Sequence, residues 1–227
     1  MKALILVFCL TAVSTMAQDT EVRDVGSFKG VKCGEAIDVY LKKGDKESVK
    51  VVTTGERLSN VLTEVSGSYL KVHIRDNNSF FRGKSDVKVY VTYVNLDRIS
   101  ASSASNVFSE GIIKSDNMEI HASSAADVEI KLDAVDVRVH ASSAADIILE
   151  GTAKSIDADA SSSGEIDAYN FQVESASASA SSAGGIKLNV TQGLEASASS
   201  GGSVRYRGNP QRTNTHSSSG GSVKKAN

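Results

Sequence analysis

The stretch ASSAADV at residues 122–128 returns almost unchanged as ASSAADI at residues 141–147. Variants of the same heptapeptide occur at residues 101–107, 160–166, 180–186, 198–204 and 217–223. Successive copies begin 21, 19, 19, 20, 18 and 19 residues apart. This period is too short for paired helices, and Ser, Gly, Val and Ile are poor helix formers. The repeats therefore predict a stack of β coils.

The final position of the heptapeptide is β-branched and apolar in every copy, which favours a buried strand position. The residues there are Val107, Val128, Ile147, Ile166, Ile186, Val204 and Val223. A coil of about 19 residues at about 3.3 Å per residue closes one circuit of a β-helix, and equivalent residues then stack about 4.8 Å apart. We therefore predict an all-β parallel β-helix (β-solenoid) over residues 99–227, with this column facing inward.

Each coil is expected to contain at least two short strands joined by a corner, because the small Ser, Ala and Gly residues of the heptapeptide permit tight bends. Residues 18–98 lack the heptapeptide, but apolar and polar residues alternate over 31–41, 49–54, 69–75 and 87–94, which predicts strands. An exposed terminal coil invites edge pairing. We therefore expect residues 18–98 to form a β-rich N-terminal cap on the solenoid.

Residues 1–17 have the pattern of a secretory signal peptide: Lys2 precedes an apolar run, and small residues follow up to Ala17. The run is shorter than the roughly 20 residues that span a bilayer. No second apolar run occurs in the sequence. We expect export to the periplasm, the cell surface or the extracellular space, and no membrane span.

The formal net charge is −2, with 25 basic and 27 acidic residues of both signs interspersed. This balance points neither to nucleic acid nor to an anionic membrane surface as a partner. Cys33 is the only cysteine after the predicted signal peptide, so no intramolecular disulfide is expected. Its thiol is expected either to be buried as a small apolar group or to be available for intermolecular pairing.

Carboxylates recur at the sixth position of the heptapeptide, as Asp127, Asp146 and Glu165. In regular coils they would be about 4.8 Å apart and form a ladder. Such a ladder is able to bind a ligand, or a hard cation such as Ca²⁺ through oxygen atoms. The alternative is a solvated corner with no ligand, and we favour this alternative.

A second polar ladder is predicted immediately before the heptapeptide, where His121, His140 and Asp159 are equivalent. Imidazole and carboxylate are zinc ligands, but a tetrahedral site needs ligands that converge, and a flat ladder does not provide this. We therefore predict a half-exposed polar ladder, with no metal centre and no cofactor.

No catalytic residues are assigned. The Gly-x-Ser-x-Gly elbow does not occur. The carboxylate ladder would satisfy the separation of about 5 to 10 Å that glycosidases use, but coils without long inserted loops offer no walls for a cleft. A polysaccharide-processing β-helix enzyme remains the first alternative. Self-assembly through strand edges, or through the loop that carries Phe80 and Phe81, is the second alternative and would make a homo-oligomer.

Short segments in a fixed order resemble a known family. They are the signal peptide ending Met-Ala-Gln, Phe28-Lys29-Gly30-Val31, Ile37-Asp38-Val39-Tyr40-Leu41, Val87-Lys88-Val89-Tyr90-Val91 and Leu96-Asp97-Arg98-Ile99, followed by the Ser-rich repeats. In this order the chain resembles the secreted auto-transporter adhesins with a head GIN domain of Bacteroidetes-type bacteria. The resemblance implies a single-stranded, right-handed β-helix.

The repeats and the resemblance together predict a non-enzymatic, adhesin-like binding or structural module of the cell envelope or the extracellular space. A glycan or a host or matrix protein is the expected partner, because flat ladders of Ser, Asp and His can form hydrogen bonds with a repeating ligand.

Overall fold

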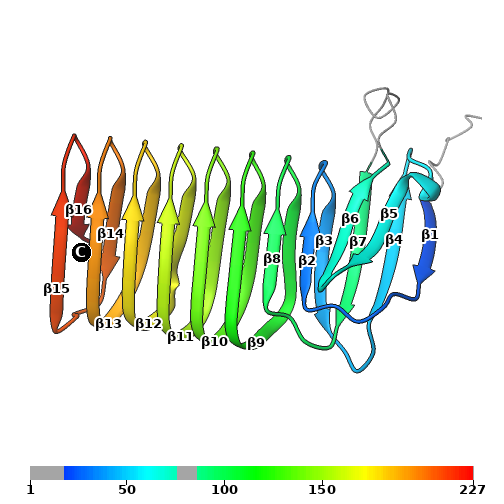
Figure 1. The fold of residues 1–227 in the computed structure, drawn as a ribbon, viewed down its shortest axis with the longest axis horizontal. Helices are drawn as coiled ribbons and strands as arrows, with labels where there is room; N and C mark the ends of the chain where they lie inside the picture. The colour runs from blue at the N-terminus through cyan, green and yellow to red at the C-terminus, as the bar shows by residue number, and fades with distance from the viewer. Residues whose placement is uncertain (1–17, 76–85, 227) are drawn as a thin grey trace, which may run out of the picture.

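The computed structural model describes residues 18–75 and 86–226, so the predicted signal peptide and the loop with Phe80 and Phe81 lie outside the described residues. The chain is a β-solenoid, a row of stacked coils with their strands side by side (Figure 1). This confirms the predicted fold class. Apart from one 3₁₀ turn, η1 (Leu58–Asn60), the elements are the strands β1 (Gln18–Arg23), β2 (Gly30–Cys33), β3 (Asp38–Lys43), β4 (Ser48–Thr54), β5 (Val61–Ser66), β6 (Tyr69–Ile74), β7 (Asp86–Tyr93), β8 (Arg98–Ala101), β9 (Asn106–Ala122), β10 (Asp127–Ala141), β11 (Asp146–Ala160), β12 (Glu165–Ala180), β13 (Gly185–Ala198), β14 (Ser203–Arg207), β15 (Arg212–Ser217) and β16 (Ser222–Lys225).

Heptapeptide copies pair position by position in parallel register, so each position of the repeat forms a column along the solenoid. The last position of the heptapeptide is at most 1 % exposed in six copies, and Val223 of the final copy is partly buried. The predicted inward column is therefore confirmed. The first position forms a second buried column, of alanines at 101, 122, 141, 160, 180 and 198.

The corner within the heptapeptide is a turn with two consecutive left-handed residues. Ser103 and Ala104 have φ angles of 55° and 58°, and the equivalent residues of the later copies also have positive φ. In six of the seven copies the fourth residue of the turn donates to the first, as from the amide of Ser105 to the carbonyl of Ser102 at 3.2 Å. Two positive φ values with this hydrogen bond define a type I′ turn. Turn amides also donate to the next coil, so the ladder continues through the corner.

Differences in coil length are accommodated by β-bulges outside this turn. Along β9 and β10, the register moves from Phe108 opposite Glu129 to Ile112 opposite Lys131, so β9 holds two extra residues. A smaller shift occurs between β11 and β12. These two bulges lie before the bend that joins the two halves of a coil, whereas between β12 and β13 the register shifts both after Ala168 and again at the bend, after Val173. The turns and the inward columns remain aligned while the period varies.

Residues 18–98 contain coils of the same kind together with antiparallel strands. The predicted strand 31–41 is wrong in one respect, because Gly34–Ile37 form a turn with positive φ at Glu35 and Ala36 that separates β2 from β3. β2 and β3 pair in parallel with β8 and β9, and β6 and β7 pair in parallel with β2 and β3. At the outer end, β4 and β5 run antiparallel to β7 and β6, and β1 pairs with β4. Within the described residues, no helix is long and apolar enough to cross a membrane.

Cys33 lies on the inward side of β2, opposite Ala101 in the next coil. It is 2 % exposed, as one of the two sequence-based alternatives predicted. Its thiol donates to the hydroxyl oxygen of Ser105 at 3.3 Å. Burial raises the pKa of the Cys33 thiol to about 11, although the Ser105 hydrogen bond acts in the opposite direction. The thiol therefore behaves as a small core group.

Candidate functional site

Asp127, Asp146 and Glu165 form one outward column immediately after the type I′ turns. Asn106 and Asp38 extend this column toward the N-terminal coils, and the Asn106 side-chain amide donates to the Asp38 carboxylate at 2.7 Å. Their outward position follows from strand alternation, because the next residue of each strand is the buried Val or Ile of the inward column.

Charge in this acidic column is partly compensated at one end. Lys187 Nζ lies 2.5 Å from Glu165 and 3.0 Å from Asp167, and hydrogen bonding to Glu165 raises the Lys187 pKa. Partial desolvation raises the pKa of Asp146, and the neighbouring charges of Asp127 and Glu165 raise it further. Within residues 18–75 and 86–226, no group of three or more His, Cys, Asp or Glu side chains is arranged to hold a metal ion.

His121, His140 and Asp159 also form a column, on the opposite half of the coils. The two imidazole rings are 5.9 Å apart and tilted by 52°. His140 Nδ1 lies 3.1 Å from Asp159, whereas His121 Nε2 lies 2.8 Å from Glu119 in its own strand. Hydrogen bonding to His121 lowers the Glu119 pKa. Each histidine thus has its own carboxylate partner along the sheet, and the ligands do not converge on one point.

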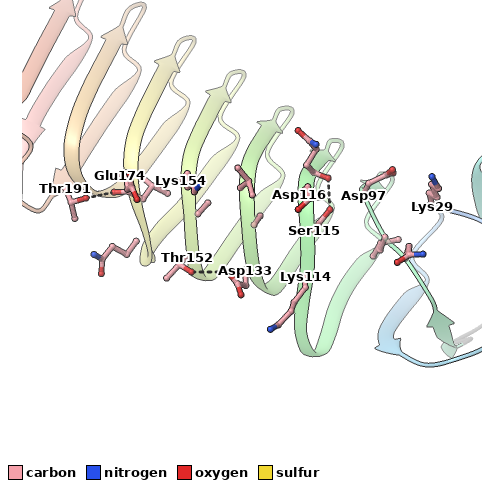
Figure 2. A pocket seen from close by; sticks show the side chains of 18 residues that line it. Lys29, Asp97, Lys114, Ser115, Asp116, Asp133, Thr152, Lys154, Glu174 and Thr191 are labelled. Carbon is pink, nitrogen blue, oxygen red and sulfur yellow. Dashed lines mark hydrogen bonds between the residues drawn. The ribbon is translucent and has the colours of Figure 1, made fainter.

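A groove of about 940 Å³ runs along the bends of the coils, at the ends opposite the type I′ turns (Figure 2). Bends of β9 to β13 and the segment before β8 contribute its walls. Its charged residues have both signs and are Asp97, Asp116, Asp133, Glu174, Lys29, Lys114 and Lys154. None of the described residues that line it is aromatic. Apart from Asp97, none of these charged groups forms an ion pair with another described residue, so they are available to a ligand.

Hydroxyl groups in the groove already donate hydrogen bonds within the protein. Thr152 donates to the Asp133 carboxylate at 3.4 Å, and Thr191 donates to the carbonyl oxygen of Val173 at 3.1 Å (Figure 2). At the bend of β9, Ser115 donates to the carbonyl oxygen of Asn117 at 2.7 Å. These bonds leave further lone pairs free for a ligand.

A second groove, of about 490 Å³, lies on the histidine side of the coils and shares Asp97 and Asn117 with the first. It also contains Arg98, Arg138 and Asp157. Oδ1 of Asp97 is buried and has no hydrogen-bond partner among the described residues, although Arg98 Nε lies 3.8 Å away. An unsatisfied buried acceptor destabilises the free protein.

Three aromatic rings stand on the acidic side of the coils. Tyr40 stacks on Tyr90 at 5.0 Å and on Phe108 at 5.3 Å between ring centroids. Lys50 Nζ lies 5.6 Å from the Tyr90 centroid, beyond the last ring. Because the rings stack on one another along the solenoid, their faces are occupied and mainly their edges face solvent. This ladder therefore stabilises the N-terminal coils rather than offering a stacking surface to a sugar.

Comparisons with known proteins agree with this architecture. The family model described as "Putative auto-transporter adhesin, head GIN domain" matches residues 27–210. The chain belongs to this family. No curated protein matches the chain.

Solved structures share the fold of this head GIN family member. A "putative adhesin" from Bacteroides fragilis NCTC 9343 superposes with a TM-score of 0.83 at 21% identity, covering 93% of this chain and 98% of its own. A "putative adhesin" from Parabacteroides merdae ATCC 43184 gives 0.73 at 17%, covering 92% and 96%. A "Putative lipid binding protein" from Parabacteroides distasonis ATCC 8503 gives 0.70 at 19%, covering 92% and 97%. At these identities the likeness shows the fold alone.

Sequence analysis of this head GIN chain missed both grooves. It named the acidic column and the histidine column, and neither column lines the larger groove. The groove residues follow the bulges, where the repeat is least regular and where residues at equivalent positions, such as Asp116, Lys154 and Glu174, differ in charge. The feature of the sequence that could have indicated the larger groove is the recurrence of charged residues about midway between heptapeptides.

Proposed function

We propose that the chain is a non-enzymatic, adhesin-like module that binds an extended, uncharged glycan along the larger groove. One observation carries the proposal, which is that a polar groove follows the bends of β9 to β13 and contains unpaired charges of both signs. Five coils at about 4.8 Å spacing give a length of about 20 Å, enough for several sugar units.

A neutral polyol suits this groove better than a polyanion or a polycation. Each sugar hydroxyl can donate to a carboxylate such as Asp133 and accept from an ammonium such as Lys154. A polyanion would meet the four carboxylates of the groove, and a polycation would meet its three lysines. The absence of aromatic side chains from the lining predicts modest affinity per site, so adhesion would depend on multivalent presentation.

The test measures binding of the mature chain to arrays of glycans and matrix proteins, with and without calcium. The groove variant is Asp116→Ala/Asp133→Ala. A matched control, Asp127→Ala/Asp146→Ala, removes the same two groups from adjacent coils on the acidic column. We expect binding to an uncharged glycan that the groove variant loses and the control retains. A loss confined to the control would move the site to the acidic column, and calcium dependence of the binding that the control loses would identify that column as a cation ladder.

Enzymatic turnover is tested on the same material. Any bound polysaccharide is incubated with the protein and assayed for new reducing ends and unsaturated products. Product formation that requires Asp116 or Asp133 would replace the binding proposal with an enzyme. If no glycan or matrix protein binds, the binding role is wrong. Light scattering of the purified chain would then show whether it self-assembles.

A further inference from the structure

Charge is distributed unevenly along the solenoid. Residues 1–195 contain all 27 acidic residues and 20 of the 25 basic residues, a net charge of −7. Residues 196–227 contain the other five basic residues and no acid. The near-neutral total charge is therefore the sum of an acidic body and a cationic end. The expectation that no anionic membrane is a partner rested on that total alone. We call Arg205, Arg207, Arg212, Lys224 and Lys225 the cationic end.

All five side chains of the cationic end are exposed. Arg205 stands between Lys187 and Lys224 in one outward column. Lys187 is paired with two carboxylates, but no member of the cationic end forms an ion pair within the part of the chain that the structure describes. The nearest partners are neutral, because Arg207 lies 4.0 Å from the Tyr169 ring centroid and Lys225 donates to Asn209 at 3.2 Å.

The inward positions of β15, one half of the last coil, are polar as well, whereas Val223 of β16 is apolar and partly buried. Thr213, Thr215 and Ser217 take the positions that Leu194, Ala196 and Ala198 hold in the coil before. The first three are exposed and the last three are buried. This half of the coil is therefore suited to a polar environment rather than to another apolar coil.

The cations surround this end instead of lining one face. Arg205 and Lys224 lie on the sheet half of β14 and β16, whereas Arg212 lies on β15 in the other half (Figure 1). A linear polyanion along one face would reach only some of the five charges. A flat anionic surface that meets the end of the solenoid would reach all of them.

The acidic body determines how the solenoid would be oriented on an anionic surface. A solenoid lying flat would bring one side of an acidic body against an anionic surface, since residues 18–195 carry a net charge of −8 (27 acidic and 19 basic residues). In an upright solenoid, most carboxylates lie farther away than the screening length of about 8 Å at physiological salt. We propose that the cationic end docks the solenoid upright on an anionic lipid membrane surface. The glycan groove of β9 to β13 would then be held away from that membrane.

The test is co-sedimentation of the mature chain with vesicles of phosphatidylglycerol and phosphatidylcholine, or of phosphatidylcholine alone. Each basic residue near an anionic surface strengthens partitioning about fivefold. Arg205→Glu/Lys224→Glu should therefore weaken binding to the anionic vesicles by at least about 25-fold, and 0.5 M salt should abolish the binding of the wild type. The control Lys32→Glu/Lys42→Glu makes the same charge change at exposed positions of β2 and β3 and should bind like wild type.

Several results would overturn the proposal. These are equal binding to the neutral vesicles, equal weakening by the control, or sedimentation of the protein without vesicles. Binding of wild type to dextran sulfate beads but not to the anionic vesicles would assign the cationic end to a soluble polyanion instead. Because the glycan array uses other residues and another probe, either proposal can fail while the other holds.

Discussion

Gly164 lies so close to the preceding coil that a β-carbon on it would be 2.5 Å from the carbonyl oxygen of Ala141. The glycines at 184, 202 and 221 occupy the equivalent position and face the equivalent carbonyl groups. The three earlier copies carry Ser105, Ala126 and Ala145 there. Where Ser105 and Ala145 close the turn, its hydrogen bond is 3.2 Å long, compared with 2.9 Å at Gly164. A β-carbon is thus accommodated only by a wider turn.

Gly164→Ala should destabilise the protein by about 1 to 3 kcal/mol, the usual effect of forcing a methyl group into a filled space. The measurement is the urea midpoint of unfolding, followed by circular dichroism. Gly185→Ala is the matched control, because its β-carbon would meet only the Glu165 side chain at an ordinary 3.7 Å. Equal midpoints for the two variants would show that the turn relaxes without cost.

Ala125→Gly should stabilise the protein. Ala125 has a φ of 57° and is exposed, and the left-handed conformation costs an L-residue about 1 to 2 kcal/mol. Glycine removes this strain but loses more conformational entropy on folding, so we expect a net gain of about 0.5 kcal/mol. Gly201 and Gly220 already occupy the equivalent position.

The adjacent substitution is its control. Ala126 is fully buried, so Ala126→Gly should lower the stability by about 1 kcal/mol through lost packing and added backbone freedom. Thermal unfolding of the two variants should therefore shift in opposite directions. A decrease for both would mean that the strain at Ala125 is offset by contacts of its methyl group.

Parts of the fold that repeat could be predicted from the sequence. Val128 and Ile147 recur at a fixed position because stacked coils give both residues the same environment, so a single column describes every coil. The type I′ geometry was less accessible. Small residues indicate a tight bend, but two consecutive left-handed residues are usually marked by Asn or Gly, and Ser124 and Ala125 are neither.

The candidate site depends on what does not repeat. Asp133 and Lys154 lie just beyond the bulges, where the coils differ in length. The spacing between heptapeptides therefore does not predict their positions. The outer coils were hidden for a related reason. β2 and β3 are joined by a turn of Gly34, Glu35, Ala36 and Ile37. Its two positive φ angles match those of the heptapeptide turn, but its sequence differs.

Asp146→Asn should raise the stability slightly at pH 7. The pKa of Asp146 is raised in the folded protein, so ionisation there opposes folding. This cost is fully present above the folded pKa and disappears as the pH falls below the unfolded value of about 3.9. Because the carboxylate is exposed, we expect a gain below about 1 kcal/mol at neutral pH and none near pH 3.5.

The comparison for this effect is Asp157→Asn, since the ladder neighbours of Asp157 are Arg138 and Ser177 rather than carboxylates. Removing that charge should leave the stability at pH 7 unchanged or slightly lower. Urea midpoints between pH 3.5 and pH 8 measure both variants. A stabilisation of Asp146→Asn that persists at pH 3.5 would show that side-chain packing, not charge, is responsible.

Cys33 should not react with thiol reagents in the folded protein at pH 8. Its thiolate is rare because burial raises the pKa to about 11, and the sulfur is almost fully covered. Ellman's reagent should therefore report no free thiol until urea unfolds the N-terminal coils, and reactivity should appear together with the loss of β signal. Since Ala101 occupies the equivalent inward position, Cys33→Ala should fold, with a stability loss of about 1 kcal/mol. The variant should not react with the reagent even after unfolding. Rapid labelling of the native chain would mean that β2 opens without global unfolding, which would make intermolecular disulfide pairing the better account of this cysteine.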